Sequence, residues 1–319
     1  MRSCGAERIV IGASGGIDSA LVAALYSSFL PPEQLMLVNM PSRFNSDTTR
    51  GLARSLAERI GCLYADVSIE PSVAVTCEQL DGLHARSVDG SVETTLRVNE
   101  LVMENIQARD RSSRILAGIA AAWGGVFTCN ANKSEMTVGY TTLYGDLGGY
   151  LASIADLWKT EVWALSRFLN SEVFGEERIP LGSIDIVPSA ELSDAQNVDE
   201  GKGDPLHYPY HDPLFAAWVE WWNRVTPEEI LQWYGEGCLG EKIGYDGDLS
   251  AHFPNAAAFV ADLERWWNLY QGMSIAKRIQ APPVLAVKRR AFGFDHRESQ
   301  MGARYTQRYR DLKQELLGT

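Results

Sequence analysis

Residues 9–25, with the sequence IVIGASGGIDSALVAAL, predict a buried strand, a glycine-rich turn and a helix in direct succession. The two adjacent glycines let backbone N–H groups turn toward an anion, and the helix that follows aims the positive end of its dipole at the same point. Ser14 and Ser19 add hydroxyl donors, and Asp18 adds a carboxylate where a magnesium ion would bridge phosphate oxygens. The stretch therefore predicts a phosphate-binding turn at the start of an α/β fold.

The residues of this turn exclude two other phosphate-binding motifs. A Walker loop needs Gly-Lys-Ser/Thr after its glycines, and a dinucleotide fingerprint needs three spaced glycines followed by an acid for the ribose. Neither occurs here. Residues 14–19, SGGIDS, instead resemble the SGGxDS loop of the ATP pyrophosphatases, which bind ATP, adenylate an oxygen of their substrate and release pyrophosphate.

The first half of the chain alternates short apolar runs with helical patterns, which is typical of a doubly wound parallel sheet. The runs predicted as buried strands are residues 9–11, 35–40, 63–67 and 126–129. Helical spacing is found in residues 18–29, 46–60 and 101–123. Ligands of such sheets bind beyond the carboxyl ends of the strands, so we expect residues 12–19, 41–46, 68–72 and 130–135 to converge there.

The second half differs in composition, because residues 206–269 contain six tryptophans and show helical spacing without strand signals. Indoles at such spacing indicate a core or an interface more often than a ligand platform. We therefore expect an α/β domain of the ATP pyrophosphatase type over residues 1–205. Over residues 206–319 we expect a helical appendage and a C-terminal substrate-binding segment that belong to the same domain.

Composition and charge narrow the class of protein. The chain has 319 residues, of which 45% are hydrophobic and 22% charged, enough for one large core or a core with an appendage. The formal net charge of −12 argues against a nucleic-acid partner. No stretch approaches the roughly 18 to 20 apolar residues of a membrane span, and the N-terminus lacks a signal pattern. We therefore expect a cytoplasmic protein that binds neither nucleic acid nor membrane.

The cysteines and histidines do not form a metal or nucleophile pattern. The five cysteines are scattered, without a Cys-x-x-Cys pair, and are expected to be buried free thiols: Cys4, Cys62, Cys77, Cys129 and Cys238. His207 and His211 are four residues apart, as zinc ligands on a helix would be. Pro209 lies between them and favours a surface loop instead.

Further segments carry functional residue types. Asn105 and Arg109 lie one helical turn apart, so an amide and a guanidinium can meet one ligand, although the pair would also suit a solvated helix face. A polar stretch over residues 130–146 directly follows a buried strand, where functional residues often lie. The remaining segments are residues 188–192 (PSAEL), 276–283 (AKRIQAPP) and 290–293 (RAFG).

Together, and in this order, these motifs resemble NAD synthetase, specifically the synthetase domain of its glutamine-dependent type. The resemblance implies the adenine nucleotide alpha-hydrolase-like fold, a homodimer or larger oligomer, and amidation of nicotinic acid adenine dinucleotide with ATP, magnesium and ammonia. The nicotinate carboxylate would attack the α-phosphate of ATP, giving an acyl adenylate and pyrophosphate. Ammonia would then attack the activated carbonyl and release AMP and NAD.

The resemblance also implies roles for individual residues. Asp18 and Lys159 would be catalytic, and Asp18 and Glu135 would hold magnesium. The residues expected to bind ATP are Gly12, Ala13, Ser14, Gly15, Gly16, Ile17, Asp18, Ser19, Asn130, Lys159 and Ser189. Those expected to bind the dinucleotide substrate are Asn105, Arg109, Glu135, Asp146 and Lys277.

Three departures from the family pattern qualify this assignment. Asn130 stands where a threonine that contacts ATP is usual. Leu143 stands where the ammonia-dependent enzymes carry a substrate lysine, a difference shared with the glutamine-dependent branch. The first predicted strand begins at about residue 8, which leaves no room before it for a nitrilase-like glutaminase domain. We therefore expect either free ammonia or ammonia from a separate glutaminase subunit.

Three alternatives remain open at this point. Another ATP pyrophosphatase, such as a GMP synthetase or a tRNA-modifying thiolase, would share residues 12–19 but not the later segments. A non-catalytic nucleotide-binding subunit would hold ATP without releasing pyrophosphate. A NAD-like synthetase could act on a related acid, because sequence does not rank the residues around the acid ring.

Overall fold

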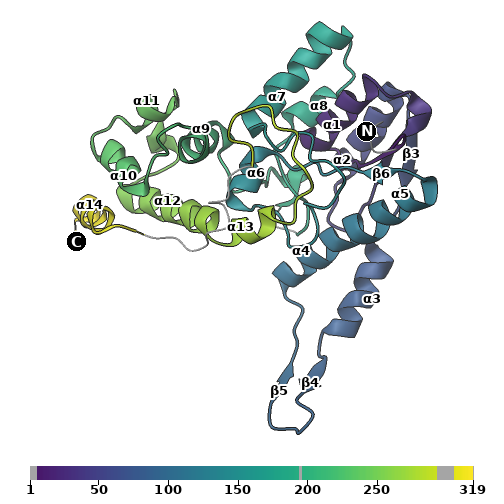
Figure 1. Ribbon diagram of the computed structural model, residues 1–319, viewed down its shortest axis with the longest axis horizontal. Helices are drawn as coiled ribbons and strands as arrows, with labels where there is room; N and C mark the ends of the chain where they lie inside the picture. The colour runs from purple at the N-terminus through teal and green to yellow at the C-terminus, as the bar shows by residue number, and fades with distance from the viewer. Residues whose placement is uncertain (1–5, 194–195, 293–304, 319) are drawn as a thin grey trace.

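A four-stranded parallel sheet lies at the centre of the N-terminal half of the computed structural model, which describes residues 6–193, 196–292 and 305–318 (Figure 1). The spatial order is β3-β2-β1-β6, and the strands are β1 Ile9–Gly12, β2 Leu35–Asn39, β3 Leu63–Asp66 and β6 Val126–Phe127. All four predicted strands are confirmed, although β6 is shorter than its apolar run. Parallel bridges from Cys129 to Ala152 and from Ala152 to Val284 continue the sheet beyond β6.

Each face of the sheet has its own layer of helices, because side chains alternate between the faces along a strand. Ile9 and Ile11 point to the face covered by α1 Ile17–Ser27, α2 Asp47–Ile60, α7 Lys159–Phe168 and α8 Leu181–Asp185. Val10 and Val38 point to the opposite face, covered by α3 Glu70–Leu80, α4 Glu100–Arg109 and α5 Ala117–Trp123. This is the expected doubly wound arrangement.

Two details of these layers differ from the prediction. β3 is an edge strand with Leu63 42% exposed, so its predicted burial on both faces was wrong. The helix predicted over residues 101–123 is continuous, but its middle, Asp110–Leu116, is π-helical. The side chain of Asn99 accepts the N–H of Val102 at its start, and Gly124 ends it in the left-handed region at φ 72°.

The C-terminal part is helical, as expected, and consists of α9 Tyr208–Val219, α10 Pro227–Gly235, α11 Leu239–Ile243, α12 Ala256–Gln271, α13 Met273–Arg278 and α14 Gln307–Leu317. Trp218 and Trp266 are fully buried in its core, so these two indoles have the predicted packing role. Trp222 is 83% exposed and does not pack in this core. The same core includes Met136 from the short helix α6 Lys133–Val138, so it extends into the sheet-bearing part. The division at residue 205 stays a prediction.

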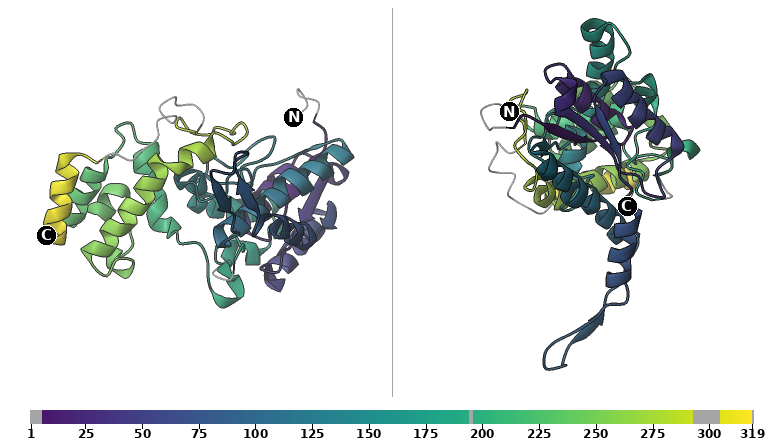
Figure 2. Two further views of the ribbon diagram at one scale, coloured as in Figure 1. Left: turned by 90° about the horizontal axis from the view of Figure 1, so that it is seen from below. Right: turned by 90° about the vertical axis from the view of Figure 1, so that its right-hand side faces the viewer.

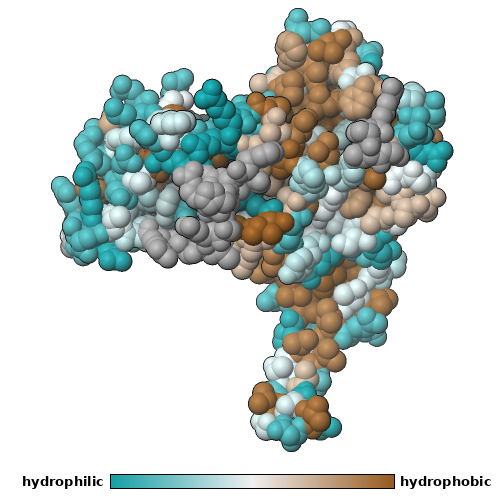
Figure 3. All heavy atoms as spheres, viewed as in Figure 1, coloured by the Kyte–Doolittle hydropathy of each residue, from teal (hydrophilic) through white to brown (hydrophobic). Residues whose placement is uncertain are grey.

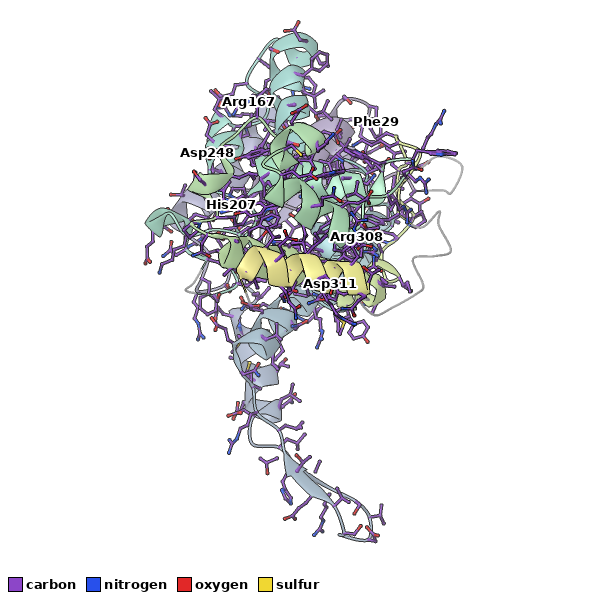
Figure 4. The ribbon with its side chains drawn as sticks, turned by 90° about the vertical axis from the view of Figure 1, so that its left-hand side faces the viewer. Phe29, Arg167, His207, Asp248, Arg308 and Asp311 are labelled. Carbon is purple, nitrogen blue, oxygen red and sulfur yellow. The ribbon has the colours of Figure 1, made fainter. Side chains whose placement is uncertain are left out.

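Helix α14 lies at the outer side of this helical part, where Figure 4 shows Arg308 and Asp311 on it. The guanidinium of Arg308 donates to the side-chain oxygen of Gln232 on α10, at 2.5 Å. At the top of the view, Figure 3 shows an apolar area over α7 and its π-helical continuation Leu169–Phe174, where Phe168 and Val173 are about half exposed.

An arm projects from the body below α3 and α4 (Figures 1 and 2). It ends in an antiparallel hairpin of β4 His84–Arg86 and β5 Glu93–Thr95. Short 3₁₀ segments complete the description: Pro32–Gln34, Val198–Glu200 and Leu249–Ala251. Within the described ranges, no helix has the length and apolar character needed to cross a membrane.

The prediction of a surface loop around His207 and His211 was wrong. Pro209 lies in the first turn of α9, where a missing N–H costs nothing, so the helix continues through it. His211 is fully buried, accepts the N–H of His207 at Nδ1 and contacts Asp262 through Nε2. Of the cysteines, Cys4 lies outside the described residues. The other four are free thiols, but only Cys129 is buried.

Candidate active site

The glycine-rich turn after β1 is closed by its own serines. The N–H of Ser14 donates to Oγ of Ser19 at 3.3 Å, and the N–H of Gly16 donates to Oγ of Ser14 at 3.2 Å. Gly15 has φ +89°, and a Cβ at that position would lie 2.1 Å from the carbonyl oxygen of Thr49. Only glycine therefore fits this close approach between the turn and the first turn of α2.

A cavity of about 270 Å³ opens at the carboxyl ends of the strands, as expected for this fold. Ten of the predicted site residues line it: Gly12, Ala13, Ser14, Asp18, Ser19, Asn130, Glu135, Asp146, Lys159 and Ser189. Gly15 and Gly16 belong to the adjoining turn, and Ile17 points into the core beneath α1. The cavity therefore brings together predicted residues that are up to 177 positions apart in the sequence, from Gly12 to Ser189.

An ion cluster lies on one wall of the cavity. Nζ of Lys159 lies 2.5 Å from Oδ2 of Asp18 and 3.6 Å from Oε1 of Glu135. The side chain of Lys159, the first residue of α7, is only 4% exposed, and its backbone N–H donates to Oγ of Ser134 on α6 at 2.9 Å. Asn132, the cap of α6, donates from Nδ2 to Oδ1 of Asp18 at 2.9 Å. Glu135 completes the capping box by accepting the backbone N–H of Asn132.

Burial and neighbouring charges shift the pKa values of this cluster in opposite directions. Burial, reinforced by Asp18, raises the pKa of Glu135 to about 8. Burial alone would lower the pKa of Lys159, but Asp18 and Glu135 outweigh it and raise the pKa above its usual value. Lys159 therefore stays a cation beside the Asp18 carboxylate, whereas Glu135 becomes a carboxylate only above about pH 8 or when a bound cation displaces its proton.

The donor set fits a magnesium ion that a nucleotide brings with it. Asp18 and Glu135 offer hard carboxylate oxygens at the phosphate turn. Within the described part of the chain, no group of three or more His, Cys, Asp or Glu side chains could hold a metal by itself. Magnesium commonly binds through one or two carboxylates plus substrate phosphates and water, so two carboxylates are sufficient here.

Three residues predicted to bind the dinucleotide substrate do not line this cavity. Asn105 Oδ1 accepts the N–H of Leu143 at 3.2 Å, and Nε of Arg109 donates to the carbonyl oxygen of the same residue at 3.0 Å. Nζ of Lys277 donates to the carbonyl oxygens of Gly139 and Thr141. All three side chains thus fix the backbone of residues 139–143, which lead to Asp146 in the cavity wall. Their contact with substrate stays a prediction.

The comparisons with known proteins agree with this geometry. The family model described as NAD synthase matches residues 1–234. The chain belongs to the NAD synthase family. It is 36% identical to the glutamine-dependent NAD(+) synthetase of Synechocystis over 72% of this chain and 38% of that protein. It is 35% identical to the NH(3)-dependent NAD(+) synthetase of Trichlorobacter lovleyi over 71% of this chain and 73% of that protein.

A solved structure shows that the fold is that of the family. A glutamine-dependent NAD(+) synthetase from Cytophaga hutchinsonii superposes with a TM-score of 0.71 at 16% identity, over 99% of this chain and 53% of that chain. The chain spans between 37% and 48% of the length of the glutamine-dependent relatives that it matches.

The sequence analysis did not predict three residues around this cavity. Arg111 lines the cavity and donates to the carbonyl oxygen of Met40 at 3.1 Å; burial lowers its pKa to about 10. Asp204 also lines the cavity, and burial raises its pKa. Arg111 lies two residues after Arg109 in the helix predicted over residues 101–123, but the π-helical turn that orients it has no sequence signal.

The third missed residue is Glu191, inside the PSAEL segment. Its carboxylate is buried and accepts three donors at the start of α2: the amide of Asn45, the N–H of Ser46 and the hydroxyl of Thr49. Glu191 has φ 46°, in the left-handed region. It therefore ties the segment that carries Ser189 to the helix beside the phosphate turn.

Proposed function

We propose that this chain amidates nicotinic acid adenine dinucleotide to NAD, using ATP and ammonia and releasing AMP and pyrophosphate. The observation that supports this most strongly is the Asp18–Lys159–Glu135 cluster beside the glycine-rich turn, inside a cavity at the strand ends. Family membership supports the same reaction, since the relatives are named NAD(+) synthetases.

The proposed chemistry depends on positioning and charge neutralisation. The turn of residues 12–19 would hold the ATP phosphates with backbone N–H groups and the hydroxyls of Ser14 and Ser19. Lys159 would neutralise negative charge that builds up on the α-phosphate while the substrate carboxylate attacks it. Asp18 and Glu135 would hold magnesium, which when bound neutralises phosphate oxygens. The pyrophosphate leaves, and ammonia then displaces AMP from the acyl adenylate, with loss of one proton.

The nitrogen donor is proposed to be ammonia. The relative from Trichlorobacter lovleyi, of which this chain matches 73%, is named NH(3)-dependent. Glutamine would serve as a donor where a glutaminase, such as a separate subunit, supplies ammonia. We also propose a homodimer, as the family resemblance implies.

Release of pyrophosphate by the purified protein tests the proposal. The reaction contains ATP, magnesium, ammonium and nicotinic acid adenine dinucleotide, with glutamine replacing ammonium in parallel. We expect release with ammonium that is lost in Asp18→Asn and retained in Asp185→Asn, the same change at a half-exposed carboxylate on α8. ATP binding without release would indicate a binding subunit, and release with another carboxylic acid alone would reassign the substrate.

A further inference from the structure

We propose that residues 283–288, here called the C-terminal strap, hold the starts of α6 and α7 in place for catalysis, and that Lys288 is the positioning residue. The inference rests on the proposed function, because α6 and α7 carry Glu135 and Lys159. It concerns a segment outside residues 1–234, the part matched by the family model.

The backbone of the strap extends the sheet beside the cavity. The N–H of Ala152 donates to the carbonyl oxygen of Pro283 at 3.0 Å, and the N–H of Leu285 donates to that of Ala152 at 3.1 Å. Ala152 in turn bridges Cys129, directly after β6. The strap is therefore hydrogen-bonded, through Ala152, to the β6 side of the sheet, where Thr128 and Asn130 on either side of Cys129 line the cavity.

A buried carboxylate connects the strap to the start of α6. Asp156 is fully buried, and its Oδ2 accepts the N–H of Val287 at 2.8 Å and that of Lys288 at 2.6 Å. Its Oδ1 accepts Nζ of Lys133, the first residue of α6, at 2.5 Å. The side chain of Lys133 has no exposed surface. Any displacement of the strap would therefore act on the helix that carries Glu135.

The side chain of Lys288 connects the strap to the start of α7. Its Nζ lies 2.6 Å from Oε2 of Glu161 and 3.2 Å from Oε1 of Glu220. The same oxygen of Glu161 accepts the N–H of Trp158, the residue directly before Lys159, at 2.8 Å. Lys288 thus orients the carboxylate that fixes where α7 begins.

Both lysines share one further acceptor. Oε1 of Glu220 lies 2.8 Å from Nζ of Lys133 and 3.2 Å from Nζ of Lys288. The two cations and three carboxylates therefore form one network across α6, α7, α9 and the strap. Lys288 is the more exposed of its two cations, with 23% of its side chain exposed against none for Lys133, so its removal disturbs the alignment of the helices more than the core.

Substitution of Lys288 tests this role. We expect Lys288→Met to lower kcat for pyrophosphate release about tenfold or more, because small misplacements of catalytic groups have large effects on rate. Lys288→Arg should restore most of the activity. Lys313→Met is the matched control, since Lys313 forms a similar ion pair with Glu264 in the helical part, away from the cavity.

Two further measurements separate positioning from a general structural effect and from failure of the proposed function. Affinity for ADP with magnesium needs no turnover, and we expect Lys288→Met to weaken it about threefold or more. In a Glu161→Gln background, Lys288→Met should have little additional effect on either quantity, because the carboxylate it orients is already gone. The inference is overturned if Lys288→Met matches the wild type in ADP affinity, if Lys313→Met has the same effect, or if the Glu161→Gln background leaves the effect unchanged. Absence of pyrophosphate release from the wild type with normal ADP binding would instead contradict the proposed function.

Discussion

Replacing Lys133 by methionine should destabilise the folded protein by about 3 kcal/mol. Removing one partner of a buried ion pair usually costs about 3 to 5 kcal/mol, because it leaves an uncompensated charge in the interior. Here Asp156 would keep two backbone N–H donors, and Glu220 would keep Lys288, so we expect the lower end of that range. Methionine has a similar length and retains the apolar part of the lysine side chain, so little of the loss should come from a cavity.

Urea denaturation of the ligand-free protein measures this free energy of unfolding. Arg167→Met is the control, because Arg167 pairs with Asp185 while both side chains are more than half exposed; its effect should stay below about 1 kcal/mol. The double variant Lys133→Met/Asp156→Asn should be more stable than Lys133→Met by at least about 1 kcal/mol, because it removes the uncompensated charge. A loss below about 1 kcal/mol in Lys133→Met, or no recovery in the double variant, would refute the reasoning.

Two other substitutions test the surroundings of the phosphate turn. Gly15→Ala should lower the free energy of unfolding by at least about 2 kcal/mol, because the new Cβ would collide with the carbonyl oxygen of Thr49 and because residue 15 has a positive φ. The control is Gly51→Ala, on the open side of α2, which should leave the free energy of unfolding unchanged or raise it by up to about 1 kcal/mol. Equal effects in the two thermal melts would count against this account. Glu191→Ala removes the acceptor for three donors at the start of α2, so limited proteolysis should cleave the segment around residue 191 several-fold faster than in the wild type. Glu200→Ala, at an exposed carboxylate, is the control and should leave this cleavage rate unchanged. Identical cleavage of both variants would show that Glu191 does not hold this segment.

The sequence predicts the sheet and the phosphate turn well because both are encoded locally. The apolar runs and the glycines of residues 9–25 fix their own conformation, and the doubly wound topology follows from their alternation with helical patterns. Asp18 and Lys159 are 141 residues apart, and only the family resemblance implied their roles; their pairing was not predicted.

Features that depend on tertiary contacts were missed or misread. The sequence analysis interprets Pro209 as a helix breaker, whereas in the first turn of α9 it stabilises the start of the helix. Asn105 and Arg109 do share one helix face, but that face meets the peptide group of Leu143. Arg111 donates to the carbonyl oxygen of Met40 from a π-helical turn, and no periodicity in the sequence predicts that turn.

The charge of the cavity leads to a last prediction, which concerns nucleotide binding. Among the described residues that line it, four are acidic and two are basic: Asp18, Glu135, Asp146 and Asp204 against Arg111 and Lys159. A triphosphate adds several negative charges to an already acidic wall, and neighbouring charges act strongly where solvent is excluded. ATP should therefore bind with magnesium at least about tenfold more tightly than in EDTA.

Substitution of one carboxylate tests whether charge repulsion in the cavity controls the affinity for ATP. At pH 9, above the pKa of about 8 that burial and Asp18 give to Glu135, Glu135→Gln removes a negative charge and also a proposed magnesium ligand. It should therefore bind ATP in EDTA more tightly than the wild type at this pH and gain less from magnesium. Glu176→Gln, at a carboxylate with 59% exposure, should behave like the wild type in both conditions. Titration calorimetry measures both affinities for each protein. Weaker binding of ATP in EDTA by Glu135→Gln would mean that Glu135 binds the nucleotide as a hydrogen-bond partner, and repulsion between the carboxylate and the phosphates would then not control affinity.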